Sequence, residues 1–154
     1  MGRFRFRLQR ILDYRTSLVE AQEAEVARCL LSLRLAEAKL AGIRARQRRA
    51  LQAMRNGAQP RADLDAGRAA MQWNYLDALR EREATCLRKI EGLSQELTCA
   101  REKLAQLKQE EQVMEKLRSR QQRRAEAAGR LQETKELDDL TATRYATSRQ
   151  EVHG

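Results

Sequence analysis

The sequence contains few of the residues that build a globular catalytic domain. Aromatic residues make up 4% of it, and it has one proline and one histidine, His153, next to the last residue. Because this histidine lies in an end that we expect to be disordered, we expect neither a His-based acid–base pair nor a zinc site. The seven glycines are scattered, and none begins a G-x-x-x-x-G-K-[ST] phosphate loop. We therefore expect no enzyme, no metal and no cofactor.

Long apolar runs are also missing. No stretch approaches the ~20 apolar residues that cross a bilayer, and the first residues lack the apolar core of a signal peptide. The three cysteines, Cys29, Cys86 and Cys99, form no CxxC pair, so we expect them to be reduced. A Cys29–Cys86 disulfide would make sense only in an oxidising compartment. These features predict a cytoplasmic protein without direct membrane insertion.

Good helix formers dominate the chain, and their apolar members repeat in steps of three and four. A spacing of 3.5 residues keeps one apolar stripe, or seam, facing a partner helix. The first seam contains Leu8, Leu12, Val19, Val26, Cys29, Leu33, Ala36, Leu40, Ile43, Ala50 and Met54, with polar Arg15, Gln22 and Gln47 between them. The second contains Leu76, Leu79, Cys86, Ile90, Leu93, Leu97, Ala100, Leu104, Leu107 and Met114.

One interruption separates the two seams. Asn56-Gly57 tolerates positive φ at a helix end, and Pro60 fits the first turn of a new helix. We therefore predict an all-α fold in which two long helices form one antiparallel coiled-coil hairpin, a rod. The expected ranges are a helix over about 5–54, a turn over about 55–67, a helix over about 68–145 and a disordered end over 146–154.

The second helix is predicted to be longer than the first. Residues after about Arg120 should lack an intramolecular partner, yet apolar side chains return at Leu131, Leu137, Leu140 and Tyr145. This overhang is either a docking element or a solvated, frayed helix.

Positive charge is concentrated in the first half. Residues 1–60 contain 13 Lys/Arg and five Asp/Glu, whereas residues 61–154 are nearly balanced. Such a basic stripe attracts nucleic acid, an anionic membrane surface or an acidic protein, and charge alone does not choose among them.

Three local patterns together resemble the FliJ family of bacterial flagellar export proteins. The opening from Phe4 to Arg15 is similar to the family's F-x-F-x-L-Q-x-L-L-D-x-R start. Asn74-Tyr75 follows the turn as in many members, although Ala78 stands where many have an aromatic residue. The stretch from Lys135 to Leu140, followed by Arg144, resembles the K-x-L-D-E-x-A-x-x-R signature near the C-terminus.

The resemblance covers nearly the whole chain and implies a function. Members of the family are stalk-like components of the flagellar type III export apparatus and serve motility. They bind the hexameric export ATPase, the membrane export gate and export chaperones. The resemblance therefore implies a protein at the inner face of the cell membrane, held there through the export apparatus.

Two sets of residues are predicted to make these contacts. The ATPase set is Phe4, Phe6, Leu8, Leu137, Leu140, Arg144 and Tyr145. The gate set is Arg44, Arg46, Arg48, Arg49, Met54, Tyr75 and Leu79. Tyr75 is either a core residue beside Leu76 and Leu79 or a docking residue.

Two other functions remain open at this point. One is a generic structural or adaptor coiled coil, which could be a parallel homodimer. The other is a basic coiled coil that binds nucleic acid, although the dense basic region of a basic zipper and stacking aromatic residues are both missing.

Overall fold

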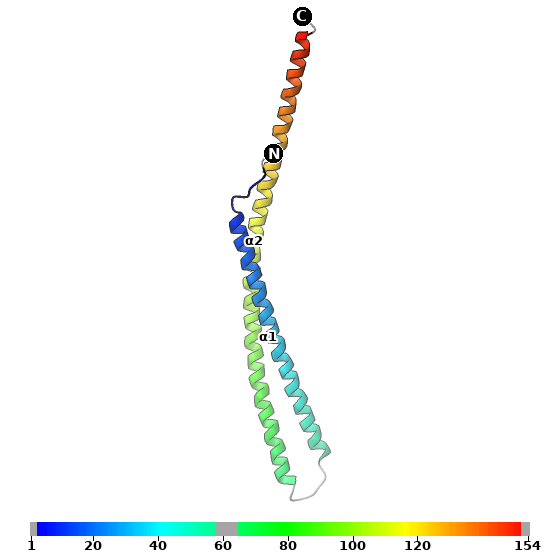
Figure 1. Ribbon diagram of the computed structural model, residues 1–154. Helices are drawn as coiled ribbons and strands as arrows, with labels where there is room; N and C mark the ends of the chain where they lie inside the picture. Colours follow the sequence, from blue (N-terminus) through cyan, green and yellow to red (C-terminus); the bar gives the residue numbers. More distant parts are fainter. Residues whose placement is uncertain (1–2, 58–64, 152–154) are drawn as a thin grey trace. The chain divides into compact units, whose positions relative to one another are not determined.

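Two long helices make up the protein. The computed structural model describes residues 3–57 and 65–151. Within them, α1 spans Gln9–Asn56 and α2 spans Asp65–Glu151, and these residues contain no strand (Figure 1). The chain divides into two compact units, each with part of both helices. Unit 1 contains residues 1–19 and 107–154, and unit 2 contains residues 20–106. The all-α helical hairpin is confirmed.

The start of α1 differs from the prediction. The helix begins at Gln9 rather than near residue 5, and residues 3–6 have no regular secondary structure. The sequence before Gln9 offers no Ser, Thr, Asp or Asn to cap a helix. The Gln9 N–H donates instead to the Phe6 carbonyl, at 3.1 Å, in a turn that leads into the helix.

The two ends that flank the turn also differ. α1 runs to Asn56, and the Gly57 N–H still donates to the Ala53 carbonyl, at 2.9 Å. Neither Asn56 nor Gly57 has positive φ, so the described end of α1 does not use the left-handed conformation that we expected there. α2 begins at Asp65, within the range that we predicted as turn. The predicted turn at Pro60 lies outside the described residues.

At its far end α2 is longer than predicted. The helix continues to Glu151, so residues 146–151 are helical rather than disordered, and residues 152–154 lie outside the described part. Thr143, Thr147 and Ser148 could each interrupt a helix, but their hydroxyls donate to carbonyls of the preceding turn. The helical hydrogen-bond pattern therefore continues through this stretch.

The core follows the predicted seams. Apart from Phe6, every residue that is buried in the described part lies on one of the two seams. In unit 2 they form two clusters. One contains Leu40, Ile43, Leu79 and Cys86, with Ile90 packed against it; the other contains Cys29, Leu97 and Ala100, with Val26, Leu30 and Leu33 packed against it. α1 and α2 run side by side and antiparallel in unit 2, as Figure 1 shows.

The three polar residues of the first seam all contact α2. In unit 2, the buried Gln22 donates from Nε2 to the Ala100 carbonyl, at 3.0 Å, and Gln47 donates to Glu83, at 2.8 Å. In unit 1, Arg15 forms an ion pair with Glu110. Each contact satisfies a polar group that a purely apolar seam would leave without a partner.

The cysteines are free thiols. Cys29 and Cys86 are buried in different clusters, and Cys99 is exposed. Cys86 Sγ lies 3.4 Å from the Ala36 carbonyl. Both buried thiols therefore act as small apolar side chains of the seam, and the disulfide considered from the sequence does not form.

Candidate functional site

The N-terminal segment of unit 1, residues 3–8, packs on α2 through its phenylalanines. Phe6 is 8% exposed and Phe4 is half-buried, whereas Arg3, Arg5 and Arg7 are exposed. This alternation is typical of an extended segment that turns every second side chain toward its neighbour. Phe6 was predicted as a contact for a partner, but its side chain already belongs to the core of unit 1.

This segment covers more of α2 than the sequence predicted. Phe4 lines a shallow hollow together with α2 residues from Ala125 to Glu136, and Gly129 there is half-buried. Residues 3–6 are not helical, and an extended chain advances about 3.3 Å per residue against 1.5 Å in a helix, so this stretch reaches farther along α2 than a helix of the same length would. The prediction that α2 has no intramolecular partner after about Arg120 is therefore wrong where Phe4 lies beside the helix, between Ala125 and Glu136.

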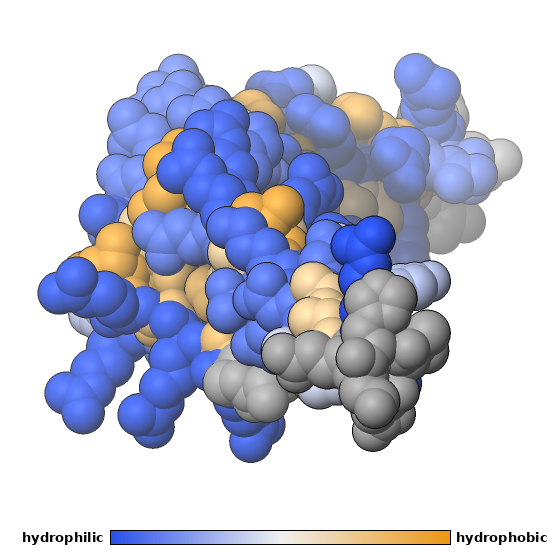
Figure 2. Space-filling model, turned by 90° about the horizontal axis from the view of Figure 1, so that it is seen from above, coloured by the Kyte–Doolittle hydropathy of each residue, from blue (hydrophilic) through white to orange (hydrophobic). Residues whose placement is uncertain are grey.

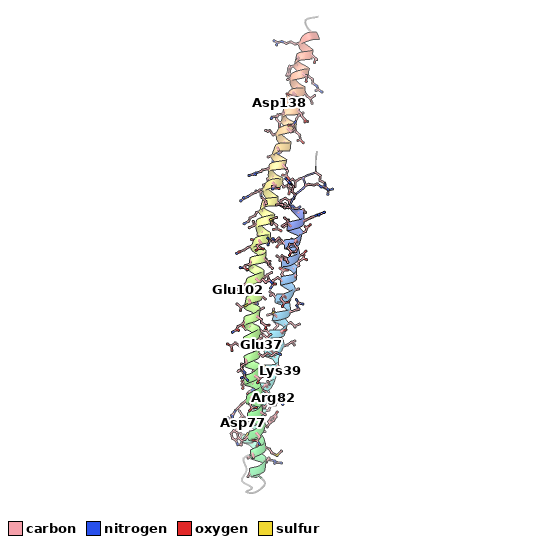
Figure 3. All side chains as sticks on the ribbon, turned by 90° about the vertical axis from the view of Figure 1, so that its left-hand side faces the viewer. Glu37, Lys39, Asp77, Arg82, Glu102 and Asp138 are labelled. Atoms are coloured by element: carbon pink, nitrogen blue, oxygen red, sulfur yellow. The ribbon has the colours of Figure 1, made fainter. Side chains whose placement is uncertain are left out.

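After the half-buried Gly129, α2 has no further buried or half-buried residue up to Arg149. We call residues 130–149 the overhang, because every one of them is exposed. The overhang has apolar side chains of considerable size: Leu131 is 61% exposed, Leu137 64%, Leu140 59% and Tyr145 77%. Figure 3 labels Asp138 in this part of α2, where no segment of α1 lies beside the helix. Of the predicted ATPase set, the structure leaves Leu137, Leu140, Arg144 and Tyr145 exposed, whereas Leu8 is half-buried.

Hydroxyl groups on the overhang are already satisfied. Thr141 Oγ1 donates to the Leu137 carbonyl, at 2.7 Å, and Thr143 Oγ1 donates to the Asp139 carbonyl, at 2.6 Å. These groups need no partner protein to complete their hydrogen bonds. A partner that covers the overhang would therefore gain mainly from the apolar side chains.

A second candidate surface lies in unit 2. A shallow groove there is lined by both helices: Lys39, Gly42, Ile43 and Arg46 come from α1, and Arg82, Thr85 and Cys86 come from α2. Figure 3 shows Lys39 and Arg82 close together on this part of the hairpin. The groove combines a small apolar floor with three basic side chains, so it suits an acidic partner with an apolar anchor.

Glu83 of α2 makes polar contacts with two residues of α1 in unit 2. Arg44 Nε donates to Glu83 Oε1 and Gln47 Nε2 donates to Glu83 Oε2, both at 2.8 Å. The hydrogen bond from Arg44, and after it the one from Gln47, lowers the pKa of the Glu83 carboxyl below its ordinary value. The carboxylate thus ties two α1 residues to α2 at neutral pH.

This contact should make the stability of the protein depend on pH. A lowered pKa in the folded state stabilises the fold above the unfolded-state pKa, and this contribution disappears as the pH falls through the folded-state pKa. We expect Glu83→Gln to be less stable than the wild type at pH 7, with the difference shrinking as the pH falls below about 4.5. Urea unfolding followed by circular dichroism measures it, with Glu91→Gln, an exposed glutamate of α2, as the control. A difference that does not change with pH would contradict this role of Glu83.

The gate set is only partly available to a partner. The prediction that Leu79 contacts the gate is wrong, because its side chain is 0% exposed and lies in a core cluster with Leu40 and Ile43. Tyr75 is 49% exposed, so it is not the core residue that its helical spacing suggested. Arg46, Arg48 and Arg49 are exposed, Arg44 is bound to Glu83, and Met54 is half-buried.

The structure adds surface residues that the sequence reasoning missed. Lys39 and Arg82 line the groove, and Met71 and Trp73 are exposed near Tyr75 in the sequence. Trp73 and Met71 are large apolar residues that do not occupy seam positions. This feature of the sequence could have identified them as surface residues. Figure 2 shows, on the face that it presents, hydrophobic patches separated by hydrophilic residues.

Other kinds of site are not found in the described ranges. No group of His, Cys, Asp or Glu among these residues could hold a metal ion. Neither described helix contains a segment that is long and apolar enough to cross a membrane. The candidate sites of residues 3–57 and 65–151 are therefore exposed surfaces.

Comparison with known proteins identifies the family. The family model of the flagellar FliJ protein matches residues 4–150, nearly the whole chain. Searches of the curated proteins and of the solved structures gave no significant match. The match spans both helices, so it agrees with the order of the three motifs and with the helical hairpin. The chain belongs to the FliJ family and is a flagellar export protein.

Proposed function

We propose that this protein is a non-enzymatic component of the flagellar export apparatus that binds the export ATPase ring and the membrane export gate. It assists the delivery of chaperones and their substrates, and these contacts hold it at the inner face of the cell membrane. The observation that supports the proposal best is the overhang, with its exposed Leu137, Leu140 and Tyr145.

The contact with the ATPase is assigned to unit 1. Apolar side chains on a solvated helix give little benefit unless a partner covers them, and burial of one leucine is worth roughly 1.5–3 kcal/mol. Leu137 and Leu140 lie on neighbouring turns, with Arg144 one turn farther along the helix. The overhang thus offers two apolar anchors and a cation to one partner surface.

Affinity purification from cells that assemble flagella tests this function. The full-length protein should retain the export ATPase, and a variant truncated after Glu136 should not. A protein that retains no export component from such cells would contradict the proposal. Retention of nucleic acid alone would favour the basic nucleic-acid-binding coil instead.

The contact with the export gate is assigned to unit 2. The basic groove lies in this unit, and Arg44, Arg48, Arg49 and Tyr75 are exposed on the same unit. Clustered cations of this kind raise the rate of association with an acidic partner, and salt screens the effect.

Replacing Arg44, Arg46, Arg48 and Arg49 with Gln should slow association with the gate by roughly tenfold at low salt. Glutamine preserves the helix, so circular dichroism should be unchanged. Surface plasmon resonance at two salt concentrations measures the association rate. An association rate that is unchanged at low salt would rule out this surface.

A further inference from the structure

Two short segments of unit 1 are strongly basic. Residues 3–12 contain four arginines and no acid, and residues 116–124 contain four arginines, one lysine and no acid. A third stretch without acids, residues 38–57, lies in unit 2. We call the cations of the two unit 1 segments the basic collar: Arg3, Arg5, Arg7, Arg10, Lys116, Arg118, Arg120, Arg123 and Arg124.

The fold brings the two segments together. Arg5 and Arg7 line one shallow hollow with Arg118 of α2, and Phe4, Phe6 and Gln9 complete it. Lys116, Arg120 and Arg123 line a second hollow on α2, where Glu115 is the one acid beside them. Residues 116–124 occupy about 12 Å of helix, which is close to the Debye length at physiological salt, so their fields add.

The collar is not neutralised within the chain. All nine side chains are exposed, and within the part of the chain that the structure describes none of them forms a hydrogen bond or an ion pair. Some arginines outside the collar do have acidic partners: Arg15 pairs with Glu110 and Arg44 pairs with Glu83. The collar cations therefore repel one another, and no acidic side chain of the fold offsets this repulsion by pairing with them.

Apolar side chains accompany the cations. Ile11 is 45% exposed and Tyr14 is 62% exposed, and they lie one turn apart on α1, where Arg10 is adjacent to Ile11 and one turn before Tyr14. Phe4 is half-buried beside the arginines of the N-terminal segment. Cations next to exposed aliphatic and amphipathic aromatic residues are the combination that peripheral membrane proteins use at the lipid headgroup layer.

Two features favour a lipid surface over other anions. The headgroup layer of an anionic membrane is uniformly negative, and the collar has one sign of charge over both of its segments, so the two match without a fixed register. Nucleic acid would leave Ile11 and Tyr14 without an apolar environment, whereas the headgroup layer accommodates both. Clusters of four to eight Lys and Arg are typical of binding to anionic lipid.

We propose that the basic collar binds an anionic phospholipid surface directly, by adsorption at the headgroups and without insertion. Arginine pairs with lipid phosphates in bidentate fashion, and eight of the nine collar cations are arginine. Adsorption at the collar requires neither the ATPase nor the gate, but the N-terminal segment of the collar also contains Phe4 of the predicted ATPase set.

Vesicle flotation with the purified full-length protein tests the proposal. One set of vesicles contains phosphatidylglycerol and phosphatidylcholine, and the other contains phosphatidylcholine alone. The protein should float with the first set, remain with the second in solution, and dissociate as salt is raised. Replacing Lys116, Arg120, Arg123 and Arg124 with Gln should weaken binding by about 100-fold or more.

A matched control separates the collar from overall charge. Replacing Arg34, Arg46, Arg48 and Arg49 with Gln removes the same charge from exposed sites of unit 2, and binding should stay within about threefold of the wild type. If the α2 variant loses helicity, a second variant makes the same test on the other segment of the collar. It replaces Arg3, Arg5, Arg7 and Arg10 with Gln.

Three results would overturn the proposal. The first is no flotation of the wild type with anionic vesicles, including the case in which it binds an acidic protein or DNA instead. The second is equal binding to neutral vesicles. The third is an equal loss in the collar and control variants.

Discussion

Truncation after Glu136 should abolish stimulation of the export ATPase while leaving the hairpin as stable as the full-length chain. The deletion removes Leu137, Leu140, Arg144 and Tyr145, and it retains every residue that surrounds Phe4. Removing exposed residues changes stability by about 0.5 kcal/mol or less, whereas two buried leucine contacts are worth roughly 3–6 kcal/mol of binding. Steady-state ATP hydrolysis with purified ATPase, together with thermal unfolding, measures both effects.

A pair of leucine variants makes the test specific. Leu137→Gln with Leu140→Gln removes the apolar anchors and keeps the length of the helix. Leu31→Gln with Leu35→Gln is the control, because those two side chains are equally exposed, at 61% and 64%, but belong to unit 2. The first pair should lose ATPase stimulation and motility, and the control pair should retain both. Normal stimulation by the truncated protein would remove the overhang from the ATPase contact.

Leu79→Ala should cause the largest loss of stability of any single truncation in unit 2. Leu76 and Leu79 are the two largest side chains with almost no exposure, and Leu79 contacts the cluster of Leu40, Ile43 and Cys86. Truncation of a buried leucine costs 2–5 kcal/mol, and in a two-helix pair few neighbours are available to collapse into the cavity, so we expect about 3 kcal/mol or more. Urea unfolding monitored by circular dichroism gives the difference.

Leu87→Ala is the matched control for this experiment. Leu87 is on the same helix and is 42% exposed, so its truncation should cost less than about 1 kcal/mol. If both variants lost the same free energy, the burial of Leu79 would not be what holds this part of the hairpin together. Retention of ATPase and gate binding by Leu79→Ala, once folded, would agree with a purely structural role.

The heptad period was sufficient to predict most of the core. A stripe that repeats every 3.5 residues can be buried along its whole length only by another helix, which is why Leu12, Leu40, Leu76 and Leu97 were assigned correctly. The heptad period did not predict the burial of Phe6, because Phe6 precedes the helix. Its burial depends on an extended segment lying on α2, and a helical period carries no information about that.

Surface sites were harder to predict than the core. Leu79 was assigned both to the seam and to the gate contact, and only the packing of both helices shows that the first assignment excludes the second. The role of Tyr75 could not be decided from the sequence, because Tyr75 is adjacent to a seam position. In the structure the seam residue Leu76 is buried in the core and Tyr75 is exposed. The groove that includes Lys39 and Arg82 depends on the alignment of two segments more than forty residues apart, so local sequence could not reveal it.

The contacts of Gln22 and Gln47 also limit how mechanical signals can pass through the hairpin. A slip of α1 along α2 by one heptad, about 10 Å, would take Gln22 from the Ala100 carbonyl and Gln47 from Glu83. The buried Gln22 amide would then lack an acceptor, at a cost of about 1–3 kcal/mol before any apolar loss is counted. These two contacts therefore stabilise one alignment of α1 with α2 in unit 2. A force applied to it is transmitted by bending or twisting the helix pair, and not by the sliding of one helix past the other.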